Sequence, residues 1–292
     1  MKNKMSKRMQ IAILLLPGIL VFGLFTLYPI LKLFVMSFFK WDFGSIFEQP
    51  FIGLTNYKDV ISDPYFQTAF ANSIVYTLIT VPAQMILGLL AAQLIHSISR
   101  LRVTFRVLYY LPVITSWVIA SLVFRYIFNT EGMLNYFLTQ VVRITDSNIH
   151  WLDTRWGGLT IAMILGIWKG IGWNMVVFLA ALQTVPQELY EVAGLDGAGR
   201  IRKFFAVTLP GIKETILFAL VMLTIGGFNV FTSILMITNG EPGHQTDTVL
   251  TWMYYKAFST GRFGYSAALS FVIAIALSML AALQFTLMKK KD

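Results

Sequence analysis

Six long apolar stretches constrain this chain more than any other feature. Each is long enough to cross a bilayer, whose hydrocarbon core takes about 20 helical residues, and five of the six contain no charged side chain. Charged residues make up only 13% of the 292 residues, against roughly 25% in a soluble globular chain. The excess apolar surface must face lipid, so the chain is predicted to be an all-α integral membrane protein. The predicted spans are approximately 11–31, 69–97, 107–124, 159–182, 216–238 and 265–288.

Positive charges at the ends of these spans predict the orientation of the chain. Cytoplasmic loops carry an excess of lysine and arginine, and most of the 23 lysines and arginines fall on the side of the N-terminus. We therefore expect both termini and the connection 186–210 to be cytoplasmic. The first span is longer than the roughly 7–15 apolar residues of a signal peptide, so we interpret it as an uncleaved anchor. The charges concerned are Lys2, Lys4, Lys7, Arg8, Arg100, Arg102, Arg106, Arg200, Arg202, Lys203, Lys213, Lys289, Lys290 and Lys291.

The rest of the composition argues against several classes of function. There are no cysteines and only three scattered histidines, so neither thiol chemistry nor a metal site is expected. The net charge of +9 is dispersed, and without a basic domain no nucleic acid partner is predicted. The spans offer no paired carboxylates and no Ser/His set for hydrolysis. Residues 1–292 are therefore interpreted as a single transmembrane domain that has no catalytic residues and is not an enzyme.

A polar connection between the fourth and fifth spans is conspicuous in so apolar a chain. Residues 186–210 contain Gly194, Gly197 and Gly199 between helix-forming runs, which predicts two short helices joined by a glycine turn. Each helix has one apolar side. Such a pair forms a docking surface for a partner, or lies as an ordinary amphipathic loop on the membrane. The apolar side chains are Leu189, Val192, Ala193 and Leu195, then Phe204, Phe205, Val207 and Leu209.

The same connection follows the pattern E-A-A-x-x-D-G-A…F…L-P. The matching residues are Glu191, Ala193, Asp196, Gly197, Ala198, Phe204, Leu209 and Pro210. On these residues the chain resembles bacterial ABC importer permeases, in which the pattern marks the cytoplasmic EAA loop. Val192 departs from the pattern, which has alanine there. The segments 51–57 and 238–242 are similar to parts of the sugar-transport branch, so the resemblance covers nearly the whole chain.

The resemblance implies a type I importer permease fold with six transmembrane helices. The implied function is that of a permease subunit for an oligosaccharide or a related sugar or polyol, in the bacterial cytoplasmic (inner) membrane. Implied partners are a second homologous permease as a heterodimer, two nucleotide-binding ATPase subunits, an extracytoplasmic solute-binding protein and lipid. The chain lacks the phosphate-binding pattern G-x-x-x-x-G-K-[ST], so no cofactor is expected on it and ATP and magnesium belong to the partner ATPase. The residues implied in coupling are Glu188, Glu191, Ala193, Gly194, Asp196, Gly197 and Ala198.

Lys169 is the one charged residue in the six predicted spans. Because a charge at bilayer depth is costly, it is expected to face a cavity or a partner. By resemblance to maltose-type permeases, Lys169, Gly170 and Trp173 match positions that face the translocation path, and Trp168 and Asn174 are added as neighbouring candidates. Two other interpretations stay open. Lys169 can snorkel to the interface, and the glycines around it can serve only in helix packing.

The fifth span contains a second candidate stretch for the path. Gly226 and Gly227 each weaken a helix by roughly 1 kcal/mol, and Asn229 brings an amide that needs a partner in hydrocarbon. The matching region of maltose-type permeases contacts sugar, which adds Val230 by resemblance. The alternative is helix packing, with Asn229 as an interhelical hydrogen-bond donor.

Other functions remain open from sequence alone. The same scaffold can carry an amino acid, a peptide or an anion, because the coupling residues do not touch the cargo. A secondary transporter normally has intramembrane carboxylates, or unwound helices with inverted repeats, and no repeat is visible. A receptor or structural membrane protein would not need the connection 186–210.

Overall fold

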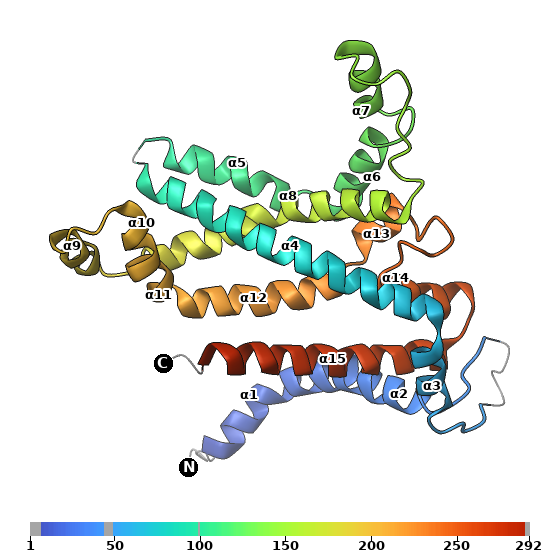
Figure 1. Cartoon of the computed structure of the whole chain (residues 1–292). Coiled ribbons are helices and arrows are strands. Elements are labelled where there is room, and N and C mark those ends of the chain that lie inside the picture. The colour runs from blue at the N-terminus through green and yellow to red at the C-terminus, as the bar shows by residue number, and fades with distance from the viewer. Residues whose placement is uncertain (1–6, 44–48, 99, 290–292) are drawn as a thin grey trace. The chain divides into compact units, whose positions relative to one another are not determined.

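Figure 1 shows a computed structural model of the chain, which describes residues 7–43, 49–98 and 100–289. The regular structure in these ranges is helical. Within those ranges, pairing of the β type is limited to two isolated bridges, Phe39 with Phe51 and Asp42 with Arg262. A helix satisfies its own backbone hydrogen bonds, which is what hydrocarbon demands. The predicted all-α membrane fold is confirmed. Four lysines of the orientation argument lie outside the described residues, namely Lys2, Lys4, Lys290 and Lys291.

Five helical segments in the described part of the chain are long and apolar enough to cross a membrane. They are Ile13–Met36, Pro64–Ser97, Arg155–Leu182, Lys213–Ile237 and Phe263–Leu287. A bent pair of helices, Arg102–Ile114 and Trp117–Ile127, whose axes differ by 88°, is a sixth candidate when the two are counted together. The predicted span 107–124 runs across this bend. Hydropathy does not reveal the bend, because the residues on both sides of it are predominantly apolar.

The chain divides into two compact units. One comprises Met1–Asp63 with Met253–Ala276, and the other comprises Pro64–Trp252 with Leu277–Asp292. All the site residues predicted from the sequence fall in the second unit.

Ring contacts and ion pairs join distant parts of the sequence in the first unit. Its helices are α1 (Lys7–Phe22), α2 (Tyr28–Met36), α3 (Thr55–Ser62) and the first half of α15 (Phe263–Lys289), with a π-helical turn at Gly23–Leu27. The rings of Phe34 and Phe271 lie 5.3 Å apart. Nη2 of Arg262 lies 3.1 Å from Oδ2 of Asp59, so α3 is tied to a segment about 200 residues further along the chain.

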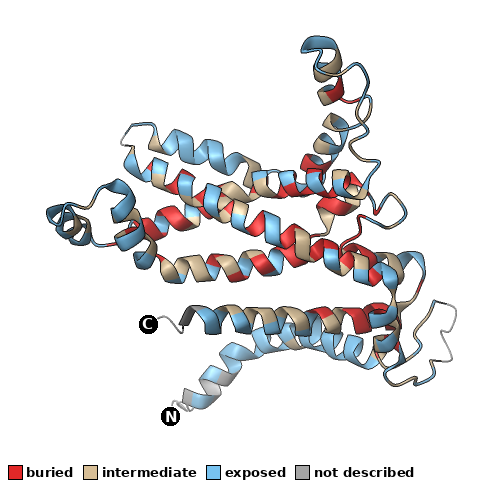
Figure 2. Ribbon diagram, in the orientation of Figure 1, coloured by how far each residue is buried: buried red, intermediate tan, exposed pale blue. Residues whose placement is uncertain are grey.

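Two long helices, α4 (Pro64–Ser97) and α8 (Arg155–Leu182), form the centre of the second unit. Their close approach depends on small residues. A β-carbon on Gly88 of α4 would lie 2.3 Å from Cβ of Asn174, and one on Gly166 of α8 would lie 2.2 Å from the hydroxyl of the facing tyrosine. Figure 2 shows buried residues along both helices. These two helices therefore provide the rigid frame of the unit.

Shorter helices surround this pair. They are α5 (Arg102–Ile114), α6 (Trp117–Ile127), α7 (Met133–Tyr136), α9 (Gln187–Leu195), α10 (Arg200–Lys203), α11 (Leu209–Gly211), α12 (Lys213–Phe228), α13 (Thr232–Ile237) and the start of α14 (Val249–Tyr254). Helix α12 packs on α4, α5 packs on α8, and α13 packs on both α6 and α8. Within this unit, α9 and α10 lie at one end of the bundle, and α6 and α7 lie toward the other (Figure 1).

Candidate functional site

A cavity of about 390 Å³ opens in the second unit between α4, α8, the start of α6 and the junction of α12 with α13. Its walls carry aromatic rings, amides and hydroxyl groups, with one lysine. Apolar faces combined with a few polar groups are typical of small-molecule sites. The cavity is therefore the candidate path for solute.

Seven predicted path residues line this cavity, four of them on α12 or just after it. They are Lys169, Gly170, Trp173, Gly226, Gly227, Asn229 and Val230. Trp168 and Asn174 are not among the lining residues. The ring of Trp168 lies 5.8 Å from that of Phe124, and Asn174 is fully buried. The part that each residue takes in transport stays a prediction.

Helix α4 supplies a cavity wall that the sequence analysis did not include. Tyr76, Thr80 and Gln84 line the cavity, and all three are buried. They lie four residues apart, so they share one face of the helix. That spacing of polar groups in an uncharged span was the signal that could have identified them.

The ammonium group of Lys169 turns toward the end of α5. Nζ donates hydrogen bonds to the carbonyl oxygens of Pro112 at 2.6 Å and Thr115 at 2.7 Å, and to Oγ1 of Thr115 at 3.1 Å. It also lies 4.8 Å from the ring centroid of Trp117. The residue is 3% exposed. Lys169 thus lies in the wall of the cavity with its three N–H donors matched by three acceptors.

The fifth span is broken where it lines the cavity. Helix α12 ends at Phe228, and α13 begins at Thr232. The hydroxyl of Thr248 donates a 2.8 Å hydrogen bond to the carbonyl oxygen of Val230 in the break, while Asn229 is exposed. Irregular backbone at membrane depth is tolerated where it lines a cavity or is buried in protein.

The coupling segment predicted at 186–210 forms a helix, a glycine turn and a second helical stretch. Helix α9 ends in a Schellman motif, in which the amide of Ala198 bonds the carbonyl of Ala193 and the amide of Gly197 bonds that of Gly194. Gly197 has a φ of 72°, and no atom lies within 4 Å of a β-carbon built there. Backbone conformation, rather than lack of space, therefore favours glycine at this turn.

The coupling segment leaves both its acidic and its apolar side chains exposed. Glu188, Glu191 and Asp196 are exposed, and Leu195 is 89% exposed. A hollow of about 460 Å³ lies between α9 and the helical stretch after α10. The residues around it are Leu189, Val192, Ala193, Asp196, Ala206, Val207, Pro210 and Gly211. An exposed apolar surface bordered by carboxylates is typical of a protein contact site.

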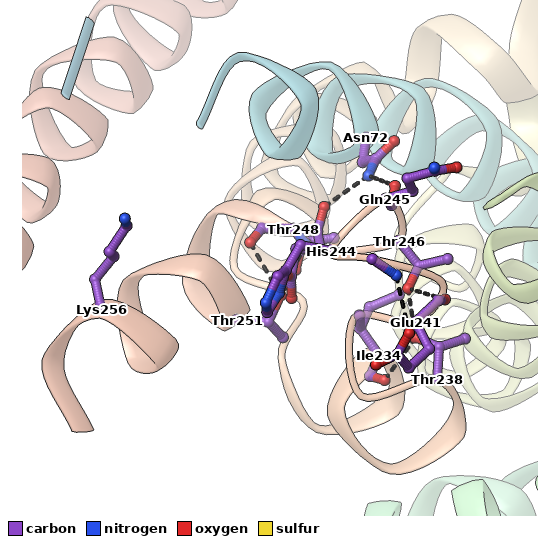
Figure 3. A network of polar contacts seen from close by, with 12 residues as sticks. Asn72, Ile234, Thr238, Glu241, His244, Gln245, Thr246, Thr248, Thr251 and Lys256 are labelled. Carbon is purple, nitrogen blue, oxygen red and sulfur yellow. Dashed lines mark hydrogen bonds and ion pairs between the residues drawn. The ribbon is translucent and has the colours of Figure 1, made fainter. Parts of the chain in front are cut away.

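A polar network fixes the connection after α13 (Figure 3). The side-chain amide of Asn72 on α4 donates to the carbonyl oxygens of Gln245 at 2.8 Å and Asp247 at 2.6 Å. Its oxygen accepts from Nε of Arg155 at the start of α8. Burial raises the pKa of the Asp247 carboxyl above its ordinary value, although a hydrogen bond from His244 acts in the opposite sense. The network holds the connection against the two central helices.

No group of three metal-ligating side chains is found among residues 7–43, 49–98 and 100–289. The geometry is that of a helical membrane subunit with an internal cavity and a separate contact segment. Such a subunit suits solute transport driven by a partner.

Residues 84–290 match the family described as binding-protein-dependent transport system inner membrane component. The chain belongs to this family. It is therefore a permease subunit of a binding-protein-dependent ABC importer, a transport protein of the inner membrane and not an enzyme.

Individual relatives agree with this assignment. The chain is 33% identical to the probable ABC transporter permease protein YurN of Bacillus subtilis, over 92% of this chain and 93% of that protein. It is 32% identical to the arabinooligosaccharides transport system permease protein AraP of Halalkalibacterium halodurans, over 97% and 88% of the two chains.

A solved structure supports the fold. A chain of a bacterial ABC transporter that imports the acidic polysaccharide alginate superposes with a TM-score of 0.83, at 23% identity, over 97% of this chain and 96% of that one. The predicted type I importer permease fold is confirmed.

Proposed function

We propose that this chain forms half of the translocation path for an uncharged oligosaccharide or a related polyol. The observation that carries the proposal is the cavity, whose wall combines Trp117 and Trp173 with the amides and hydroxyls of Gln84, Asn229 and Thr80. Sugars present C–H faces that pack on aromatic rings and hydroxyls that bond to amides. The relative AraP, named for arabinooligosaccharides, supports the same class of solute.

The absence of a free charge in this wall favours a neutral solute over an anion. Lys169 is the only charged residue among those that line the cavity, and its ammonium already donates to Pro112 and Thr115. A carboxylate ligand would have to compete with three existing acceptors. Sugar hydroxyls can bond to the amides of Gln84 and Asn229 instead, which leaves the acceptors of Lys169 in place.

The segment 186–210 is proposed to dock on a partner ATPase, which binds ATP and magnesium. Its exposed apolar side chains fill a groove on that partner. Glu191 and Asp196 pair with basic groups there. The rigid turn at Gly197 transmits movement between α9 and the helices that follow. The coupling residues proposed from the resemblance are Glu188, Glu191, Ala193, Gly194, Asp196, Gly197 and Ala198.

The whole assembly is proposed to contain a second homologous permease, two ATPase subunits and an external solute-binding protein. The chain serves as one transmembrane domain, with both termini and the segment 186–210 in the cytoplasm. Closure of the ATPases moves the docked segments and opens the cavity outward, where the binding protein delivers solute. ATP hydrolysis then returns the path to its inward-open form.

Co-purification of the tagged chain from its native membrane tests the proposal. The expected companions are a P-loop ATPase and a second permease. ATPase activity of this assembly in lipid nanodiscs is then measured with the binding protein loaded with neutral oligosaccharides, acidic oligosaccharides, amino acids or peptides. The proposal is supported if, of these four classes of solute, only neutral oligosaccharides stimulate the ATPase activity. Stimulation by an acidic sugar, an amino acid or a peptide refutes the solute class, and a chain that purifies without an ATPase refutes the docking role.

A further inference from the structure

Lys169 contacts the turn between two helices as well as lining the cavity. It sits in the middle of α8, but its ammonium reaches the point at which α5 ends and the chain turns into α6. The two helices differ in direction by 88° across Thr115 and Ser116. A single side chain from a rigid helix thus contacts the corner of a broken span.

The end of α5 has a surplus of acceptors that Lys169 satisfies. The last four carbonyls of any helix lack partners within it, and the negative end of the helix dipole attracts a cation. The carbonyl oxygens of Pro112 and Thr115 are two of the acceptors at this corner. Oγ1 of Thr115 also donates to the carbonyl oxygen of Pro112, at 2.6 Å, whereas the carbonyl oxygen of Thr115 accepts from Lys169. Because an unsatisfied carbonyl is costly in an apolar environment, the Thr115 carbonyl at the bend needs this donor.

The α5–α6 corner also sets the shape of the cavity. Val113, on one side of the bend, and Trp117, on the other, both line it. The 4.8 Å approach of Nζ to the Trp117 ring fixes that ring beside the ammonium. A change of angle at Thr115 would therefore move two wall residues at once.

We propose that Lys169 is a positioning residue that holds the α5–α6 bend and thereby shapes the cavity for solute. Lys169 acts through Val113 and Trp117 rather than by binding solute with its charge. This inference rests on the proposed role of the cavity in the path. Its geometric part, the bend itself, can be measured without any transport assay.

Spin labels on either side of the bend give the direct test. The chain has no cysteine, so Val103→Cys on α5 and Tyr126→Cys on α6 are its two labelling sites, and the companion subunits are used in cysteine-free form. Both positions are 71% exposed. At 1.5 Å per residue, the two backbone sites are about 24 Å apart across a right-angled bend and about 35 Å apart in a straight helix. The pair is measured in the purified transporter with its companion subunits, in nanodiscs.

We expect Lys169→Met to lengthen or broaden this distance distribution, and Lys169→Arg to keep the short distance. Kinetics are measured in transporters without the labelling cysteines. There we expect Lys169→Met to raise the KM for solute several-fold with a smaller change in maximal rate, and Lys169→Arg to keep the wild-type KM. An unchanged short distance in Lys169→Met overturns the proposal. Loss of transport with an unchanged distance points instead to direct contact between Lys169 and solute.

A chemical rescue decides the matter if Lys169→Met fails to assemble. In unlabelled Lys169→Cys, aminoethyl methanethiosulfonate adds an ammonium group, whereas ethyl methanethiosulfonate adds a neutral chain of similar length. Recovery of transport with the aminoethyl reagent alone supports the proposal. Equal recovery with both reagents, or no recovery with either Arg or the aminoethyl group, overturns it. If the solute proves not to be a sugar, the distance measurement across the bend still tests the role of Lys169.

Discussion

The amide of Ala198 donates a 2.9 Å hydrogen bond to the carbonyl oxygen of Ala193. This bond closes the Schellman motif at the end of α9, and it requires the left-handed backbone of Gly197 between the two residues. The turn that joins the two halves of the coupling segment is thus set by backbone conformation.

Gly197→Val is expected to weaken this turn by about 1–2 kcal/mol, because a branched residue is strained at positive φ. Uptake falls and the ATPase loses its response to loaded binding protein, while the permease still inserts. Gly197→Asn is the matched control, since asparagine tolerates the left-handed region and open space surrounds the β-carbon. Wild-type activity in both Gly197→Val and Gly197→Asn would mean that the left-handed turn is not needed. Uptake and stimulated ATPase activity are the measurements.

Two adjacent glycines on α12 are expected to respond in opposite ways to alanine. A β-carbon on Gly227 would lie 2.8 Å from Oγ1 of Thr77 and 3.3 Å from its Cα, whereas one on Gly226 meets no atom within 4 Å. Gly227→Ala should force α12 away from α4 and destabilise the protein by about 1–3 kcal/mol. Gly226→Ala should stabilise the helix by roughly 0.5–1 kcal/mol. Thermal unfolding in detergent distinguishes them, and a Gly227→Ala variant as stable as wild type would contradict the close approach.

Asn135 organises the segment after α6 through one buried amide. Nδ2 donates to the carbonyls of Thr130 and Ile149, and Oδ1 accepts from the amide of Ile149 and the indole N–H of Trp151. Asn135→Leu leaves these partners without a hydrogen bond, and each unsatisfied group lowers the stability of the fold by about 1–3 kcal/mol. We expect faster hydrogen exchange at Ile149, and faster proteolysis around it. Exposed Gln140→Ala serves as the control, and identical exchange in both variants would refute the central role of Asn135.

The buried carboxyl of Asp247 predicts a dependence of stability on pH. Burial raises its pKa in the folded protein above the ordinary 3.8, so the folded state binds more protons than the unfolded state between the two values. This contribution to stability is present below about pH 3.8 and is lost as the pH rises through the folded pKa. Asp247→Asn should remove that decline. Unfolding midpoints measured against pH test this, and parallel curves for wild type and variant would exclude the effect.

Hydropathy and one motif predicted much of this structure. Uncharged runs located the long apolar helices, because hydrocarbon accepts little else. Glycines between helix-forming residues predicted the turn at Gly197. Both signals are local in sequence, so no knowledge of packing was needed to interpret them.

The bend at Thr115 could not be predicted in the same way, and the spacing of polar residues on α4 indicates a polar face without indicating which helix that face meets. The bend is contacted by Lys169, which is more than 50 residues away in the sequence. The orientation of Gln84 toward α8 depends on Gly170, which leaves room for its side chain. Such features arise from pairing between helices, and a single sequence contains no record of which helices are neighbours.

The break in the fifth span between Phe228 and Thr232 has a consequence for how long solute stays in the path. Peptide groups near such a break need water or another hydrogen-bonding partner. The carbonyl oxygen of Val230 already accepts from Thr248, so a sugar hydroxyl that bonds there replaces an existing hydrogen bond, and each such exchange gains only about 0.5–1.5 kcal/mol. Weak holding gives short residence times. Short residence suits a translocation path, because a solute that bound tightly here would block the passage of the next one.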